Sequence, residues 1–197
     1  MTQTPGTGSL EQILRLLQAI GLSAAYQVEM AAFIAQAPQA LVYGIRDLNG
    51  AVLQIDLKEQ QFADTSWING SFAQVRLTDE LNPLPPYPSL ILAGGAGRID
   101  TAQSGPYDET WVAQWRYRID AVVMAESSDP ESAQRLALMM LMAFDSLIER
   151  NQQLGGLVQL IHPETPAIPG GSGKLQASGH LAGAMLRYGA DVLVPRP

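Results

Sequence analysis

The stretch DPESAQRLALMMLMAFDSLIERN, residues 129–151, decides the fold because it predicts one long and strongly apolar helix. Asp129 is a natural N-cap, Pro130 stands at the first helical position, where its missing N–H costs nothing, and Glu131 favours the positive end of the helix dipole. We expect the helix to end near Asn151. One stripe of side chains at helical period suits burial against a sheet: Ala133, Leu136, Ala137, Met140, Phe144, Leu147 and Ile148.

Further apolar residues carry the hydrophobic surface of this helix round to its other sides: Leu138, Met139, Leu141 and Met142. A helix that is apolar on most sides must be covered on most sides. Either an extra layer within the chain or another subunit can provide that cover, and the adaptable side chain of methionine suits both. We take these four residues as candidates for a subunit interface.

The sequence predicts strands on both sides of the long helix. Before it, residues 111–123 alternate between an apolar face and a polar face that carries Gln114, Arg116, Arg118 and Asp120. The apolar face comprises Trp111, Ala113, Trp115, Tyr117, Ile119, Ala121 and Val123. After the helix, residues 157–162 and 181–194 each read as a strand.

The first third of the chain predicts helices and then a hairpin. Residues 1–8 form a polar, glycine- and proline-bearing tail that we expect to be flexible, and a capping-box spacing from Ser9 to Gln12 then begins a helix that ends at Gly21. A second helix follows over residues 23–36. From residue 40 the period changes to two, and Asn49-Gly50 favours a tight turn between two strands.

Long loops separate the strands of the central region. A further strand is predicted around residues 72–77 and a short one at 90–92, and between them NPLPPYP, residues 82–88, reads as an extended arm because each proline removes a backbone donor. Residues 94–106 and 162–174 predict long loops. Together the elements predict a single α+β domain over residues 9–197, with an antiparallel β-sheet packed against the long α-helix, N-terminal helices and long loops.

Charge and composition exclude several classes of function. The chain of 197 residues has 12 basic and 19 acidic residues, a formal net charge of −7 that disfavours nonspecific binding to nucleic acid. It has no cysteine, so disulfides and thiolate metal sites are excluded. The longest apolar run, residues 136–144, is too short to cross a bilayer, and the first residues do not resemble an export signal, so we expect no membrane partner.

No motif predicts catalysis. PGGSGK, residues 169–174, fails the phosphate-loop pattern because Ile168 stands where the first glycine is needed and Leu175 replaces the hydroxyl that would hold magnesium. His162 with Glu164 has no third metal ligand, and Ser172 with His180 lacks the surroundings of a nucleophile elbow. The acidic residues are scattered over loops, a strand and a helix start: Asp100, Asp108, Glu109, Asp120, Asp129 and Glu131. We therefore expect no enzyme, cofactor or metal site.

Several stretches resemble the tail terminator, or tail completion, proteins of long-tailed bacteriophages. They are YRIDAVVMAE (117–126), the helix of residues 129–151, GLVQLIHP (156–163) and HLAGAMLRYGADVLV (180–194), with a looser likeness in the first hairpin. The small members of that family lack anything like residues 58–110, which we therefore expect to be an elaborated insertion.

The resemblance implies a structural virion protein that is assembled in the host cytoplasm. Its subunits would close into a ring, usually six-fold, that caps the tail tube, contacts the sheath and the head connector or stopper, and lets genomic DNA pass without specific binding. Residues of the long loops then become candidates for docking: Arg98, Asp100, Tyr107, His162 and Lys174. Another neck, connector or stopper protein of the phage, or a small hydrolase, remains an alternative interpretation.

Overall fold

The computed structural model describes residues 6–36, 42–46, 52–56, 70–100, 112–164, 168–174 and 179–195. The helices are α1 (Leu10–Gly21), α2 (Ala24–Gln36) and α3 (Pro130–Glu149), with a short 3₁₀ helix, η3 (Leu154–Gly156). The strands are β1 (Val42–Arg46), β2 (Val52–Asp56), β3 (Gln74–Leu77), β4 (Ser89–Asp100), β5 (Val112–Ser127), β6 (Leu160–Pro163), β7 (Ile168–Lys174) and β8 (His180–Pro195). The predicted α+β class is confirmed.

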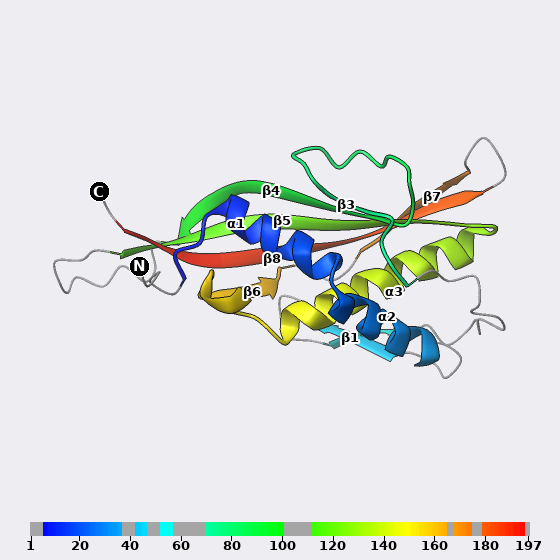
Figure 1. Ribbon diagram of the computed structural model, residues 1–197, viewed down its shortest axis with the longest axis horizontal. Helices are drawn as coiled ribbons and strands as arrows, with labels where there is room; N and C mark the ends of the chain where they lie inside the picture. Colours follow the sequence, from blue (N-terminus) through cyan, green and yellow to red (C-terminus); the bar gives the residue numbers. More distant parts are fainter. Residues whose placement is uncertain are drawn as a thin grey trace.

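The main sheet has six strands in the order β3-β4-β5-β8-β6, and β7 also pairs with β8 (Figure 1). Four strand pairs are antiparallel, as expected: β4 with β5, β5 with β8, β6 with β8, and β7 with β8. Because β3 and β4 run parallel, the sheet is mixed. β1 and β2 form the predicted antiparallel hairpin as a separate two-stranded sheet.

The two long strands β5 and β8 form the spine of the sheet. They pair without interruption from Val112 with Pro195 to Ser127 with His180. The predicted alternation of β5 is confirmed, because Ile119, Ala121 and Val123 are completely buried on one face. The residues on the same face of β8 are buried as well: Ala182, Ala184, Leu186, Tyr188, Ala190 and Val192. This apolar face is the surface on which α3 packs.

The start and end of α3 follow from local sequence. The side chain of Asp129 accepts a hydrogen bond from the backbone N–H of Ser132 at 2.8 Å, and Pro130 occupies the first helical position. After the helix, Gly155 and Gly156 have positive φ angles of 65° and 92°, which glycine adopts at little cost. The predicted helix is therefore confirmed to within two residues of its expected end.

The N-terminal helices complete the helical layer. Ser9 and Gln12 form the predicted capping box, with hydrogen bonds of 3.2 Å and 2.9 Å that join each backbone N–H to the other side chain. α1 packs on β3 and β4, on the same face of the sheet as α3, and α2 packs on α3. Tyr26 of α2 stacks on Phe72 with ring centroids 4.6 Å apart.

Backbone hydrogen bonds attach residues 6–8, before α1, to other parts of the chain. The N–H groups of Gly6 and Gly8 donate to the carbonyls of Gly156 and Leu157 at 2.7 Å, and the carbonyl of Gly6 accepts from the N–H of Leu193 at 2.6 Å. Gly6 has a positive φ of 83°, a backbone conformation that glycine adopts at little cost. Of the tail expected over residues 1–8, residues 6–8 are therefore attached to the 3₁₀ turn and to β8.

Within the range 58–110, the part that the structure describes, residues 70–100, contributes to the main sheet. Within this range β3 and β4 are integral strands, and Leu90 and Leu92 are completely buried. The predicted loop at 94–106 is wrong for residues 94–100, which continue β4 through an irregularity between Gly95 and Arg98. The predicted loop at 162–174 is interrupted in the same way, because β6 extends to Pro163 and β7 begins at Ile168.

Candidate interaction surfaces

The four residues expected at a subunit interface are buried inside the protomer. Leu138 is 6% exposed, Met139 and Met142 are 1% exposed, and Leu141 is completely buried. The cover that the sequence required comes from the chain itself, with the sheet on one side of α3 and α2 on the other. These residues belong to the core, and they form no exposed apolar patch.

Polar contacts help to join α3 to the layers around it. The hydroxyl of Tyr188 on β8 donates to Oδ1 of the buried Asp145 at 2.8 Å, and the hydroxyl of Tyr26 on α2 donates to the carbonyl of Met140 at 3.3 Å. Burial raises the pKa of Tyr26. Each contact satisfies a polar group in an apolar environment and so fixes how the layers sit against each other.

The outer face of α2 is exposed and carries no charge. Leu22, just before the helix, is 55% exposed and Val28 is 71% exposed. The rest of this face is small or uncharged: Ala24, Ala25, Gln27, Ala31, Ala32 and Ala35. The helix has one charged residue, Glu29, and its carboxylate turns towards α3, where it accepts hydrogen bonds from Ser146 at 2.9 Å and from Arg150 at 2.5 Å.

The sequence alone does not reveal this surface. Its signal was the composition of α2, where alanine and other uncharged residues surround a single glutamate. Apolar residues on this helix are spread round its circumference and do not form one stripe. The helical periodicity of the sequence therefore did not show which of them would be exposed to solvent.

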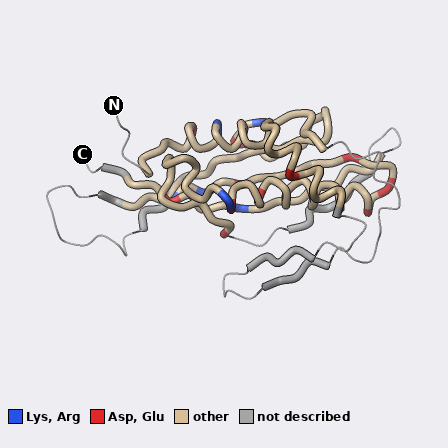
Figure 2. Tube along the Cα trace, turned by 60° about the horizontal axis from the view of Figure 1, so that its bottom comes forward, with Lys and Arg blue, Asp and Glu red and all other residues tan. Residues whose placement is uncertain are grey.

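The face of the main sheet opposite α3 carries ion pairs between neighbouring strands. Arg116 binds Asp191 through two hydrogen bonds of 2.6 and 2.9 Å, and Arg187 binds Asp120 through two of 2.5 and 3.0 Å. Each pair joins residues that are directly opposite in β5 and β8. Charged residues are sparse along the described chain, most of which is tan in Figure 2. The hydrogen bond from Arg187 to Asp120 raises the pKa of the guanidinium group.

A third ion pair lies between these two and packs closely over a glycine. Arg118 pairs across the strands with Gly189, and its guanidinium lies 3.6 Å from the carboxylate of Glu164. A Cβ on Gly189 would lie 2.7 Å from Oε1 of Glu164 and 3.2 Å from Cδ of Arg116. Three arginines and three carboxylates therefore balance one another on this face.

The residues expected in docking loops are dispersed. The backbone of Arg98 and Asp100 belongs to β4, and that of Lys174 belongs to β7, where it pairs with His180. Tyr107 lies outside the described residues.

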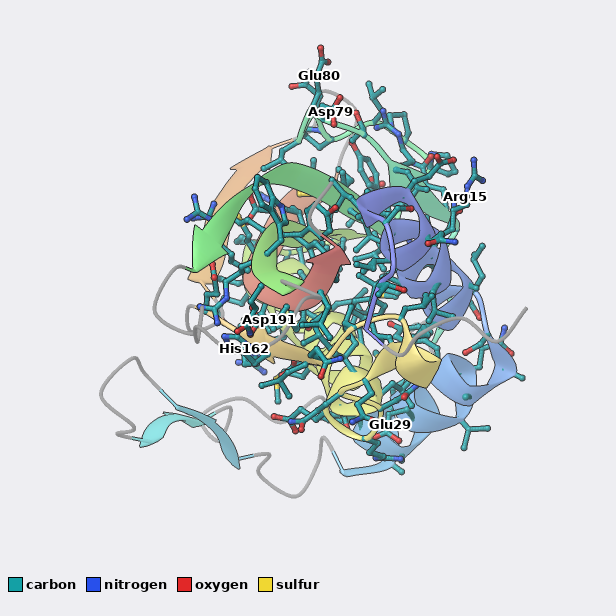
Figure 3. The ribbon with its side chains drawn as sticks, turned by 90° about the vertical axis from the view of Figure 1, so that its left-hand side faces the viewer. Arg15, Glu29, Asp79, Glu80, His162 and Asp191 are labelled. Carbon is teal, nitrogen blue, oxygen red and sulfur yellow. The ribbon has the colours of Figure 1, made fainter. Side chains whose placement is uncertain are left out.

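His162 is half-buried in β6, pairs with Gly189, and lies on the same side of the sheet as Asp191 (Figure 3). Its Nδ1 atom has no hydrogen-bond partner among the described residues. Among the candidates whose backbone the structure describes, Arg98 and Asp100 lie on β4, His162 on β6 and Lys174 on β7.

Two residues considered for catalysis or metal binding lie within β7 and just after β6. Ser172 lies within β7 and not at a sharp turn into a helix, and Glu164 faces Arg118. Within the described ranges no three histidine or acidic side chains come close enough to hold a metal ion.

Residues 78–88 form an exposed arm beside β3. Its carbonyls are held by two side chains of that strand: Nε2 of Gln74 donates to Leu84 at 2.5 Å and to Pro86 at 3.0 Å, and Arg76 donates to Asn82 at 3.1 Å. The predicted extended arm is therefore confirmed as a segment outside the strands, and residues 81–86 are all exposed.

Comparison with known proteins gives no family assignment. The chain matches no protein-family model, and no curated protein is similar to it. Among the described helices, none combines the length and hydrophobicity needed to span a membrane.

Proposed function

We propose that this protein is a structural protein of a bacteriophage virion, similar to the tail terminators of long-tailed phages. In this role copies of the chain close into a ring, most simply a hexamer, over the last ring of the tail tube. The ring ends polymerisation of the tube and offers its other face to the head connector or stopper, beside the sheath where the tail has one. It assembles in the host cytoplasm and remains in the neck of the virion.

The observation that carries the proposal is the arrangement of the stretches on which the resemblance rests. They correspond to β5, α3, β6 and β8, and these elements adjoin one another in space. β5 and β8 pair along their full lengths, α3 covers the apolar face of that pair, and β6 extends the sheet beside β8. The stretches thus form one packed unit with a continuous core.

The outer face of α2 supports assembly where α3 does not. Ring closure needs a head-to-tail interface in which one surface of the protomer meets a different surface of the next. Interface cores are poor in charged residues, and the outer face of α2 has none. With Val28 and Leu22 more than half exposed, burial of this face against a neighbour would remove apolar surface from water.

The charge of the chain fits the passage of DNA. A net charge of −7 per subunit gives a six-fold ring a strongly negative field, which repels phosphates wherever it faces the lumen. The arginines described on β5 and β8 of that face, Arg116, Arg118 and Arg187, are each paired with a carboxylate. DNA would then pass through the pore without adhering.

Assembly in the presence of tail tubes tests the proposal. We expect the purified wild-type protein to form rings at tube ends in negative-stain images and to stop further growth of the tubes. Val28→Glu places a charge on the outer face of α2 and should abolish ring closure while the protomer still folds. Ser128→Glu, at an exposed position before α3, is the matched control and should assemble normally.

Two other outcomes would reassign the protein. A position between the head and the terminating ring, seen by electron cryomicroscopy of virions, would make it a connector or stopper. Turnover of ester, phosphoester or peptide substrates by the pure protein, with no effect on tubes, would make it a hydrolase.

A further inference from the structure

The arm between β3 and β4 is fixed in place by its backbone and leaves its side chains outside. In addition to the contacts from Gln74 and Arg76, the N–H of Thr78 donates to the carbonyl of Leu92 at 3.1 Å and the carbonyl of Pro88 accepts from Ala73 at 2.7 Å. Both ends of the arm are therefore tied to the sheet, and the middle is attached through alternate carbonyls. Such a segment loses little conformational entropy when a partner binds it.

The exposed part of the arm is apolar and has few hydrogen-bond donors. Leu81 is 40% exposed and Leu84 is 51% exposed, and the prolines at 83, 85, 86 and 88 have no N–H. The carbonyls of Asn82, Leu84 and Pro86 are already used by β3. The arm therefore presents two leucines, the proline rings and the intervening carbonyls to a partner. It cannot extend a partner's β-sheet, because that requires a row of backbone N–H donors.

Acidic side chains flank this apolar segment. Asp79 and Glu80 are exposed at the outer edge of the molecule, well away from Glu29 on the opposite side of the view (Figure 3). Neither forms an ion pair with any residue in the described ranges, although Glu80 accepts a hydrogen bond from Asn82 at 3.1 Å. Their charge is therefore available to a partner, and it would repel nucleic acid.

We propose that residues 79–86, the proline arm, dock into a partner protein whose surface has an apolar pocket for Leu84, a rim of lysine or arginine facing Asp79 and Glu80, and N–H donors for the carbonyls of Pro83 and Pro85. The proposal rests on the proposed function, because in a tail the surfaces available to such an arm are those of adjoining rings. The partner we assign is the tail tube protein.

Binding to assembled tail tubes tests the proline arm. Tubes of the phage's own tail tube protein are mixed with each variant and sedimented, and the bound fraction is measured against concentration. Leu84→Ser and the double variant Asp79→Lys with Glu80→Lys should each weaken binding by about tenfold or more. Leu160→Ser is the matched control, since Leu160 is a similarly exposed leucine, 39% exposed, that lies on β6 and outside the arm.

Salt dependence gives an independent measure of the acidic flank. Binding of the wild type should weaken as salt rises, and binding of Asp79→Asn with Glu80→Asn should depend less on salt because the flank no longer carries charge. Circular dichroism should show the same fold for all variants, because the substituted residues are exposed.

The outcomes separate this inference from the proposed function. If the wild type caps tubes and both arm variants bind as well as the Leu160→Ser control, the proline arm is not the docking element, although the terminator function stands. If the arm variants bind tubes normally and lose binding to the head connector instead, the assignment to the tube is wrong. Failure of the wild type to bind either ring overturns both proposals.

Discussion

Tyr188 of β8 donates a hydrogen bond of 2.8 Å to the carboxylate of Asp145 on α3, inside the core of the protein. Tyr188 is completely buried and Asp145 is 3% exposed, so the contact joins the sheet to the helix where water does not compete. A hydrogen bond to a charged acceptor in such surroundings is worth more than one at the surface, and loss of the donor leaves a buried carboxylate with one partner fewer.

Tyr188→Phe should therefore destabilise the protein without changing its fold. We expect the free energy of unfolding to fall by about 1–3 kcal/mol, measured by urea denaturation followed by circular dichroism. Tyr117→Phe, at a half-buried position on β5, is the control and should change stability much less. Equal stability of the Tyr188→Phe variant and the wild type would show that the contact adds nothing.

Substitution of the methionines of α3 distinguishes a core from an interface. Met139→Glu and Met142→Glu place a charge where the wild-type side chains are 1% exposed, and we expect each to cost more than about 3 kcal/mol and prevent stable folding. Thermal melts of the purified variants make the measurement. If the Met139→Glu variant is instead a stably folded monomer that fails only in ring assembly, these residues lie at a subunit interface and not in the core.

Local signals in the sequence predicted the ends of the helices well. The caps at Ser9 and Asp129 depend on a few neighbouring residues, and both form the hydrogen bonds that their spacing indicates. The alternation of β5 was equally clear, because one face of that strand packs on helices and the other carries ion pairs. A helix cap depends on a few neighbouring residues, and the alternation of a strand depends on that strand alone. Both could therefore be predicted without knowledge of how the whole chain folds.

Other features depend on contacts that sequence does not reveal. Glycines at 94 and 97 suggested a loop, yet both lie in β4. Neighbouring side chains approach the strand closely there, since a Cβ would come within 2.9 Å of Leu10 at position 94 and 1.5 Å of Trp115 at position 97. The glycines reflect close packing of a helix and a ring on the strand.

The cover of α3 posed a similar problem. The hydrophobic surface showed that the helix is buried on most sides, but its sequence could not distinguish α2 from another subunit as the cover. The exposed face of α2 and the arm at residues 79–86, the two surfaces now proposed for contacts, became visible only through burial in the folded chain.

The ion pair between Arg116 and Asp191 should stabilise the pairing of β5 with β8. Asp191 is 5% exposed, so removal of either partner leaves a charge with less compensation in a partly buried place. A double-mutant cycle with Arg116→Ala and Asp191→Ala should give a coupling energy of about 1–3 kcal/mol, measured by denaturation. The cycle built on the exposed pair Arg15 and Glu11 should give less than about 0.5 kcal/mol. Indistinguishable coupling in the two cycles would contradict the role assigned to burial.

The N-cap of α3 should make stability depend on pH in acid. The hydrogen bond with Ser132 lowers the pKa of Asp129 below its ordinary value of 3.8. Because the pKa is lower in the folded protein than in the unfolded chain, the stabilisation is fully present above pH 3.8 and is lost as the pH falls through the folded pKa. At neutral pH Asp129→Ala should reduce the free energy of unfolding by about 1 kcal/mol, and the difference from the wild type should shrink as the carboxylate becomes protonated. Asp129→Asn retains a hydrogen-bond acceptor but has no carboxylate to protonate, so its stability should not show this dependence on pH. A deficit of the alanine variant that stays constant down to pH 2, about two pKa units below the ordinary value of an aspartate, would show that the charge of Asp129 does not contribute to the cap.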